Sequence, residues 1–297
     1  MHARLTLVTL LFSCLSLFFV SAAPPPFAAE LVTLADAYDG RKAAPVATNY
    51  YEHTITSLLQ VDTIRTDRLK GKNVLLYTKN GEGYVHDNIP ASIQAIKKLA
   101  DENGFTVIAS EDPGMFTPDQ LKQFDVLVFS NTNNDIFDTP EQEQAFQQYM
   151  QSGGRFVGIH SACGSERDWP WFWRNLGGKF VRHPPRQDFD VKVIDKRNPS
   201  TDFLPDPWRI KNDECYYIDN LNPNIHVLLA ADLTTVEDEK KDEFPGRIFG
   251  DLFPTSWCHT TDGGRQWYTS LGHRSEHYSD PMLMRHILGG IEWVLEE

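Results

Sequence analysis

The chain has 297 residues, of which 41% are hydrophobic and 12% aromatic, and its formal net charge is −13 at pH 7. This hydrophobic content is enough for a packed core and excludes wholesale disorder. The negative charge, with no block of Lys and Arg, argues against a nucleic acid as partner, because a polyanion would be repelled.

The first residues have the pattern of a secretory signal peptide. An apolar stretch, Leu5–Val20, follows a short basic start, and residues 20–22 have the small side chains of a cleavage site. The stretch is short for a membrane span, and no basic stop-transfer cluster follows it. We therefore predict a signal peptide at residues 1–22 and an exported protein, periplasmic or secreted, without a membrane span after cleavage.

Export would permit disulfides, but the cysteine count limits them. The chain beyond residue 22 contains Cys163, Cys215 and Cys258 and no CxxC pair. At least one thiol must remain free, and we expect buried, unpaired cysteines.

Residues 23–71 show no strong periodicity and are predicted to form a linker and an N-terminal arm, with a short helix near residues 54–60. A folded domain is predicted over residues 72–297.

From residue 72 onward, short apolar runs alternate with helical patterns. The runs predict buried strands at Asn73–Tyr77, Phe105–Ala109, Asp125–Phe129 and Arg155–Ile159. The helices are predicted at Asn88–Asn103, from Thr117, and from a capping box at Thr139 to Ser152. This alternation predicts an α/β fold whose mostly parallel sheet has helices on both faces.

The C-terminal half has the pattern of added β-hairpins. Strands are predicted at Phe189–Asp195, Arg209–Ile218, Ile225–Ala230 and Arg265–Leu271. Asp262-Gly263-Gly264 is a hairpin turn signal before the last of them, and a final helix is predicted from Asp280 to Glu296.

Ligands of such sheets bind beyond the carboxyl ends of the strands, so the loops that follow the strands are the expected positions of functional residues. His86 and Asp87 follow the first strand. The fourth strand leads into Gly158-Ile159-His160-Ser161-Ala162, which has the form of a nucleophile elbow with small residues around a projecting side chain. That side chain is His160, which can act as acid, base or metal ligand.

Further candidates lie downstream. They are His183 in a turn, the adjacent carboxylates Asp213 and Glu214, and His259, Arg265, Tyr268 and His273 around the last hairpin. Neighbouring side chains on a strand point to opposite faces, so one of the two carboxylates is expected to enter the pocket.

In their order and spacing, the motifs resemble those of the ThuA-like (trehalose utilisation) family within the class I glutamine-amidotransferase-like superfamily. The resemblance covers Lys72 to Glu297. Its motifs are Tyr84-Val85-His86-Asp87, residues 153–162, Leu176–Phe180 with His183-Pro184, Asp213–Tyr216, Gly264–His273 and Gly290–Trp293. Many relatives have His-Pro where this chain has Asn198-Pro199. Either one possible ligand position is in doubt, or this position is only a turn.

The resemblance implies a flavodoxin-like α/β sandwich and a role in sugar utilisation, especially of disaccharides oxidised to a 3-keto form. It does not imply glutaminase chemistry, because His160 occupies the position of the superfamily's cysteine nucleophile and Cys163 lies three residues later.

Two functions remain open. The first is an enzyme that acts on a keto-sugar or disaccharide derivative, as a hydrolase or lyase, by acid–base chemistry of histidines and a carboxylate. Its predicted catalytic residues are His160, His86, Glu214 and His273. Its predicted substrate-binding residues are Asp87, His183, Asp213, His259, Arg265 and Tyr268. The second function is a non-catalytic exported carbohydrate-binding protein.

A divalent metal such as zinc or manganese, held by His86, His160, Glu214 and His273, is compatible with these residue types. No HExxH motif supports it, and no nucleotide cofactor is expected. The expected partner is a small sugar, and a homo-oligomer remains open.

Overall fold

The computed structural model describes residues 68–240, 242–244 and 250–296, all within one compact unit. The predicted signal peptide, the short helix near residues 54–60 and most of the predicted arm lie outside these residues. Arg68 Nη1 donates to Glu296 Oε1 at 2.9 Å, so the two ends of the described chain are adjacent.

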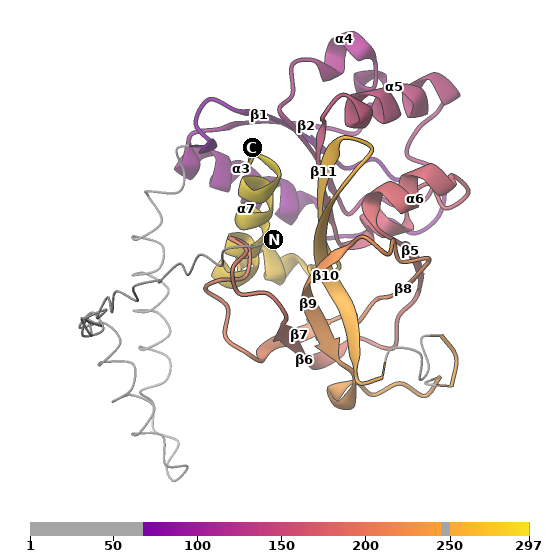
Figure 1. Ribbon diagram of the computed structural model, residues 1–297, viewed down its shortest axis with the longest axis vertical. Coiled ribbons are helices and arrows are strands. Elements are labelled where there is room, and N and C mark those ends of the chain that lie inside the picture. The colour runs from indigo at the N-terminus through magenta and orange to yellow at the C-terminus, as the bar shows by residue number, and fades with distance from the viewer. Residues whose placement is uncertain (1–67, 241, 245–249, 297) are drawn as a thin grey trace, which may run out of the picture. The chain divides into compact units, whose positions relative to one another are not determined.

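The predicted α/β fold is confirmed (Figure 1). Four parallel strands in the order β2-β1-β3-β4 form the first part of a nine-stranded sheet. They are β1 (Asn73–Tyr77), β2 (Thr106–Ser110), β3 (Val126–Ser130) and β4 (Arg155–Ile159), each within one residue of its predicted position. Every residue of β3 is buried, as expected for a parallel strand covered on both faces.

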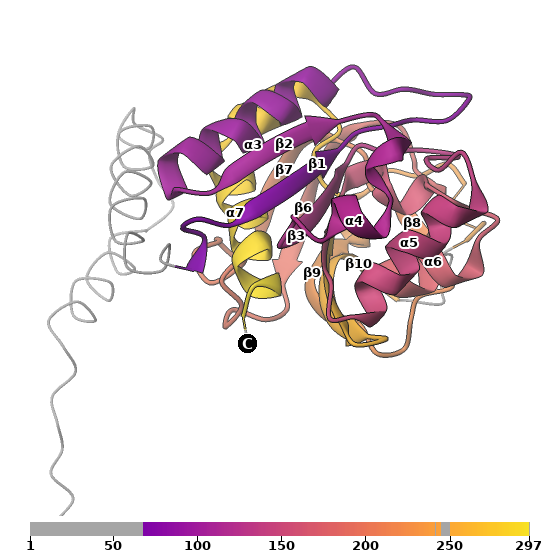
Figure 2. The same ribbon diagram turned by 90° about the horizontal axis from the view of Figure 1, so that it is seen from above.

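The helices cover both faces of this part of the sheet, as Figure 2 shows. One face carries α3 (Ile89–Asn103) and α7 (Pro281–Val294), and the other carries α4 (Pro118–Leu121), α5 (Pro140–Gln151) and α6 (Pro170–Leu176). Each helix has a proline in its first turn, where the missing N–H costs no helical hydrogen bond. The predicted capping box is wrong: the side chain of Thr139 makes no capping bond, and Gln142 Oε1 accepts from the amide of Asp138.

The second part of the sheet is mostly antiparallel and continues in the order β11-β10-β9-β6-β7. Its strands are β6 (Gln187–Val193), β7 (Trp208–Asp213), β9 (His226–Asp232), β10 (Leu252–Thr261) and β11 (Gly264–Thr269). The short strands β5 (Lys179–Arg182) and β8 (Tyr217–Asp219) form a separate pair. Short 3₁₀ turns are η3 (Pro113–Met115), η4 (His160–Gly164), η5 (Leu233–Thr235) and η6 (Ser275–Ser279).

The predicted strand Arg209–Ile218 is wrong, because it comprises β7 and β8, which belong to different sheets. Asn212 adopts a left-handed backbone conformation with φ 48°, and residues 214–216 then leave the ladder. Both β5 and β10 were missed by the sequence analysis.

The hairpin predicted at Asp262-Gly263 is confirmed and positions the site. Both residues have positive φ, 50° and 87°, as a type I′ turn requires. β11 returns from this turn parallel to β4, with Thr269 opposite Ile159. The segments that follow β4 and β11 therefore leave the sheet at the same edge.

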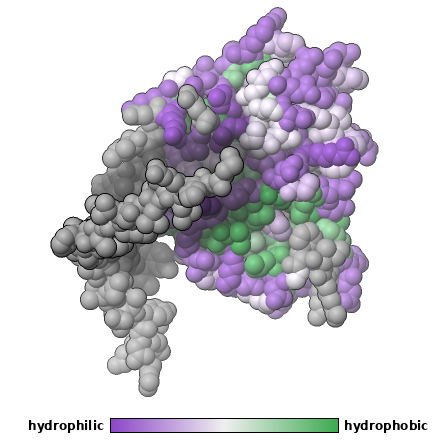
Figure 3. All heavy atoms as spheres, in the orientation of Figure 1, coloured by the Kyte–Doolittle hydropathy of each residue, from purple (hydrophilic) through white to green (hydrophobic). Residues whose placement is uncertain are grey.

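The face seen in Figure 3 is mostly hydrophilic, in keeping with the net charge of −13, and a smaller apolar area lies over β9 and β10. Cys163, Cys215 and Cys258 are buried and unpaired, as expected. Among the described residues, no helix has both the length and the apolar character that a membrane crossing needs.

Two buried histidines away from the sheet edge make stability depend on pH. Burial lowers the pKa of both His259 and His286 to about 4, although each ring contacts a backbone carbonyl. The unfolded chain, with a histidine pKa near 6.5, binds more protons between these values, so stability is lost as the pH falls from 6.5 towards 4. We expect the free energy of unfolding to decrease by about 2 kcal/mol per histidine between about pH 7 and pH 5.

Urea unfolding over this pH range measures the effect. His286→Gln should show a shallower decline than the unsubstituted protein, and identical slopes would contradict the assignment to His286.

Candidate functional site

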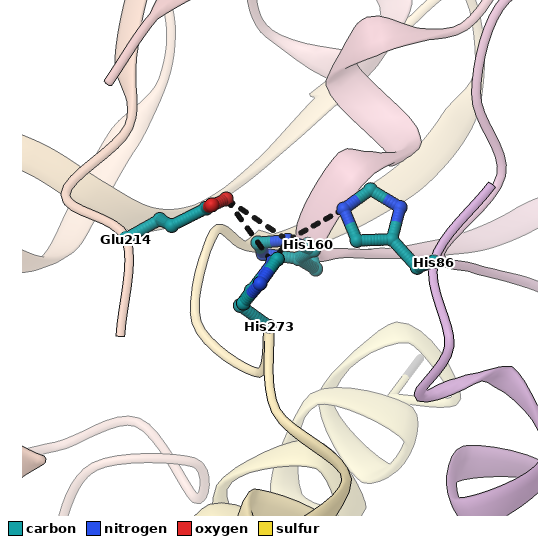
Figure 4. Close-up of side chains that lie close together, drawn as sticks. All are labelled: His86, His160, Glu214 and His273. Atoms are coloured by element: carbon teal, nitrogen blue, oxygen red, sulfur yellow. Dashed lines mark hydrogen bonds and ion pairs between the residues drawn. The ribbon is translucent and has the colours of Figure 1, made fainter. Parts of the chain in front are cut away.

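Four buried side chains converge where the carboxyl ends of the parallel strands meet (Figure 4). They are His86, His160, Glu214 and His273, and one ligand atom from each lies within 4.8 Å of the others. The Nε2 atom of His160 is 3.2 Å from His86 Nε2 and 3.3 Å from His273 Nδ1. Glu214 Oε2 is 3.2 Å from His273 Nδ1 and 3.7 Å from His160 Nε2. All four were predicted as catalytic residues, and the structure brings them together.

His160 occupies the tight turn between β4 and η4. Its backbone is left-handed, with φ 52°, and the Oη–H of Tyr268 donates to its carbonyl at 2.8 Å. A Cβ on Gly158 would lie 2.7 Å from Leu176 Cδ1 and 3.0 Å from Tyr268 Cδ2, so a larger residue there would require these side chains to shift. The elbow expected from the sequence is therefore present in the backbone, and it aims the imidazole at the cluster.

The hydrogen bonds of His160 leave its Nε2 atom unprotonated, so this nitrogen can bind a metal or accept a proton. Its Nδ1 lies 2.7 Å from the carbonyl oxygen of Ser270, which can only accept, so Nδ1 carries the proton. Burial, together with the neighbouring His86, holds the pKa of His160 well below its usual range. The ring is therefore neutral, and the Nε2 lone pair faces the cluster, 2.9 Å from the hydroxyl of Tyr216.

His86 is held in the same neutral state. Burial is the main cause that lowers its pKa to about 4, and His273 adds to the effect. Its Nδ1 lies 3.3 Å from Ser161 Oγ, on the residue after His160. With Nδ1–H directed at this hydroxyl, Nε2 presents its lone pair to the cluster.

The two adjacent carboxylates have different roles, and only one of them enters the cavity, although Glu214 lies beyond the end of β7 and not within a strand. Asp213 is buried beneath the cavity and accepts from the amides of Gly272 and His273 at 2.9 and 3.1 Å. It thereby positions the loop that carries His273. Burial raises the pKa of Asp213, against the opposing effects of His277 and these amides.

Glu214 is the carboxylate that enters the cavity. Burial raises its pKa, but the hydrogen bond with His273 and the nearby His183 outweigh burial and hold the pKa below its ordinary value. Glu214 is therefore ionised, with Oε2 in the cluster and Oε1 3.4 Å from His183 Nε2.

A cavity of about 480 Å³ lies over the cluster. Its lining residues are Tyr84, His86, Asp87, Asn133, Ser161, Gly164, Arg167, Phe180, His183, Arg186, Glu214, Tyr216, His273 and Arg274. Of the predicted substrate-binding residues, Asp87 and His183 therefore line the cavity.

Four of the predicted substrate-binding residues lie outside the cavity lining: Asp213, which holds the His273 loop from below, and the three that follow. His259 is buried on β10, where its Nε2–H donates to the carbonyl of Asn175 at 2.9 Å. Arg265 is the second residue of β11, at the end of the strand opposite the cluster, where its guanidinium lies 4.0 Å from the ring centre of Trp293. Tyr268 lies beneath the elbow and supports its backbone without lining the cavity. The assignment of these four to substrate binding is corrected accordingly.

Asn198 also lies outside the cavity lining. Its side chain accepts from the amide of Ser200 at 3.0 Å, so the Asn198-Pro199 segment is a turn, one of the two interpretations that the sequence left open.

The sequence analysis did not identify Arg167, Arg186, Arg274 and Tyr216 as site residues. Tyr216 follows Glu214 by two residues and Arg186 follows His183 by three, so proximity to predicted residues was the available signal. Arg167 is seven residues past His160 and carries no such signal.

The geometry of the cluster fits a divalent metal ion. Ligands about 2.0–2.2 Å from a tetrahedral zinc ion are separated from one another by roughly 3.3–3.6 Å. Four of the six separations among the three imidazoles and the carboxylate, at 3.2, 3.3, 3.2 and 3.7 Å, lie close to this range, and the two between His86 and the pair His273 and Glu214 do not exceed 4.8 Å. Two neutral imidazoles, one ionised carboxylate and a third imidazole are suitable donors for zinc or manganese.

Comparisons with known proteins agree with this fold. The model of the ThuA family, described as trehalose utilisation, matches residues 73–294. A ThuA-like protein of Bacteroides uniformis is 24% identical, with a TM-score of 0.59 over 75% of this chain and 91% of that one. A ThuA-like protein of Parabacteroides merdae is 22% identical, with a TM-score of 0.58 over 76% and 90%. No curated protein matches the chain.

Proposed function

Because the chain belongs to the ThuA family, whose description is trehalose utilisation, we propose that it is an enzyme that acts on a keto-sugar or disaccharide derivative at a bound divalent metal. The observation that carries the proposal is the convergence of three imidazoles and one carboxylate from four separate segments, three of which line one cavity while His160 is buried directly beneath them. We include export in the proposal, on the basis of the apolar stretch at residues 5–20.

The cluster is better suited to a metal than to proton transfer among its own members. His160 Nε2 has no proton of its own, yet His86, His273 and Tyr216 all approach it within 3.3 Å. One lone pair on His160 Nε2 cannot accept hydrogen bonds from three neighbouring groups. A cation at the centre of the cluster would instead be bound by the lone pairs of the imidazoles and the carboxylate together. Ser270 then orients His160 from behind, as the partners of metal-bound histidines do.

The proposed reaction starts with a sugar that carries a carbonyl at C3. The carbonyl acidifies the proton on C2, so a base removes that proton and the electron pair forms an enolate on the C3 oxygen. When the C3 carbonyl re-forms, a C1–C2 double bond forms and the C1–O bond breaks, and the leaving oxygen takes up a proton from the protonated base or from water. A divalent metal held by His86, His160, Glu214 and His273 would supply positive charge for the enolate oxygen.

His183 is the imidazole left for proton transfer when the other three hold the metal. It lines the cavity, its Nδ1 lies 2.8 Å from the carbonyl of Pro184, and its Nε2 is 3.4 Å from Glu214 Oε1. These contacts orient Nε2 next to the cluster, where a bound C2 proton would lie. We assign His183 as the base in this proposal.

Metal removal provides the direct test. We expect about one zinc or manganese ion per chain by mass spectrometry, and dialysis against dipicolinate should remove both the metal and the turnover of a 3-keto-disaccharide. Adding the metal back should restore turnover. A stripped protein that processes the sugar at the original rate would contradict the metal-dependent mechanism.

A second candidate is a non-catalytic carbohydrate-binding protein. Tyr84 favours it, because this aromatic ring is 60% exposed at the cavity, where it can stack on a sugar. Binding and product formation measured on one glycan panel separate the two functions, since tight binding without any bond change would favour the second.

A further inference from the structure

Three arginines from three segments line the cavity above the cluster. Arg167 follows η4, Arg186 lies between β5 and β6, and Arg274 follows β11. The carboxylates of the lining are Asp87 and Glu214, and Glu214 is committed to the cluster. In a chain with a net charge of −13, the cavity therefore gathers positive charge against the overall trend.

Neutral groups hold Arg167 in place. Its Nε donates to the carbonyl of Gly164 at 2.9 Å and its Nη2 to Asn133 Oδ1 at 3.1 Å. The guanidinium also lies 5.6 Å from the ring centre of Phe180. These partners fix the orientation of the cation without neutralising it, so its charge remains available to a ligand.

Arg186 and Arg274 differ in their partners. Within the described part of the chain, Arg186 forms no ion pair, and the residue is exposed at the cavity. Arg274 donates from Nε to Glu276 Oε1 at 3.0 Å, which partly offsets its charge. Arg167 and Arg186 are therefore the two cations best placed to bind an anion.

Building on the proposed function, we propose that the substrate is an acidic sugar derivative whose carboxylate or phosphate binds Arg167 and Arg186. The planar guanidinium forms two parallel N–H···O bonds with either anion, so both groups share the chemistry that this cavity would recognise. The sugar ring then extends from the arginines to the metal cluster across a cavity of about 480 Å³, a size typical of small-molecule sites. A neutral sugar would leave both guanidinium groups unused.

Binding of three simple probes to the metal-containing protein tests the inference. We expect glucuronate, glucose 6-phosphate or both to bind at least about tenfold more tightly than glucose by titration calorimetry. An Arg167→Gln, Arg186→Gln double variant should lose this preference while its affinity for glucose and its metal content stay unchanged. Arg209→Gln is the matched control, because Arg209 is an exposed arginine outside the cavity lining.

The outcomes separate this inference from the proposed function. Preference for glucuronate alone or for glucose 6-phosphate alone supports the inference and identifies the anion. Equal affinity for glucose and both acidic probes overturns the inference even if the protein holds its metal and turns over a neutral keto-sugar. An anion preference that survives in the double variant overturns the assignment to Arg167 and Arg186, and absence of both metal and turnover overturns the proposed function itself.

Discussion

Replacing His160 with asparagine should reduce turnover of a 3-keto-disaccharide by about 1,000-fold or more and metal affinity by at least about 100-fold. His160 is the centre of the cluster, since His86, His273 and Glu214 all lie within 3.7 Å of its Nε2. Asparagine is preferred to alanine because it tolerates the left-handed backbone, φ 52°, at this position. Alanine should give the same loss of turnover, with an added cost in stability. Turnover assays and metal analysis on the same preparations measure both effects.

His226→Ala provides the control. His226 is a half-exposed histidine on β9 that pairs with Asp195 at 2.7 Å, away from the cluster, so its loss should leave metal and turnover unchanged. Unchanged metal content with lost turnover in His160→Asn would make His160 the base and exclude it as a ligand. If both metal content and turnover stayed unchanged in His160→Asn, His160 would not be a functional residue of the site.

The cluster could be predicted because parallel strands impose a simple geometry. An apolar run followed by Gly-x-His-x-Ala locates both the end of β4 and the side chain that projects from it. The hairpin signal at Asp262-Gly263 returns β11 to the same edge, so His273 emerges beside His160. Local patterns were sufficient here because each residue lies within a few positions of a strand end.

His259 and Arg265 were misplaced for the converse reason. Both are close to the hairpin in sequence, but β10 runs antiparallel to β11, and Arg265 lies on β11 next to the hairpin turn, far from the carboxyl end of that strand. The strand β10 was not recognised because Pro254 and several polar residues interrupt its apolar pattern. Without β10, the direction of the chain at these two residues could not be assigned.

The arginines of the cavity could not be predicted from the sequence for a different reason. Exposed loop residues such as Arg186 have no periodicity to indicate where they point, and the loop that carries Arg186 is held over the cluster by tertiary contacts such as the pairing of β5 with β8. Charged residues at loop positions are also common on every protein surface, so residue type alone does not mark them. Their convergence is a property of the topology.

Gly289→Ala should destabilise the domain by about 2–3 kcal/mol, even though alanine is the better helix former by about 1 kcal/mol. Gly289 lies in the middle of α7, where a Cβ would lie 2.5 Å from the carbonyl oxygen of Pro199 and 2.5 Å from the Cα and amide nitrogen of Ser200. These are backbone atoms, which cannot move aside as a flexible side chain would. The overlap therefore outweighs the gain in helix propensity, and the melting temperature should fall by roughly 5–10 °C.

Lys97→Ala on α3 is the matched control, because Lys97 is exposed in a helix interior and its replacement should change stability by less than about 0.5 kcal/mol.

The Gly289 substitution also acts on the site at a distance, since Ser200 accepts from the Nε1–H of Trp267 on β11, the strand that leads to His273. A shift of the Ser200 backbone should therefore lower metal affinity along with stability. A Gly289→Ala protein as stable as the original would show that α7 and the residue 199–200 turn separate more easily than their packing indicates.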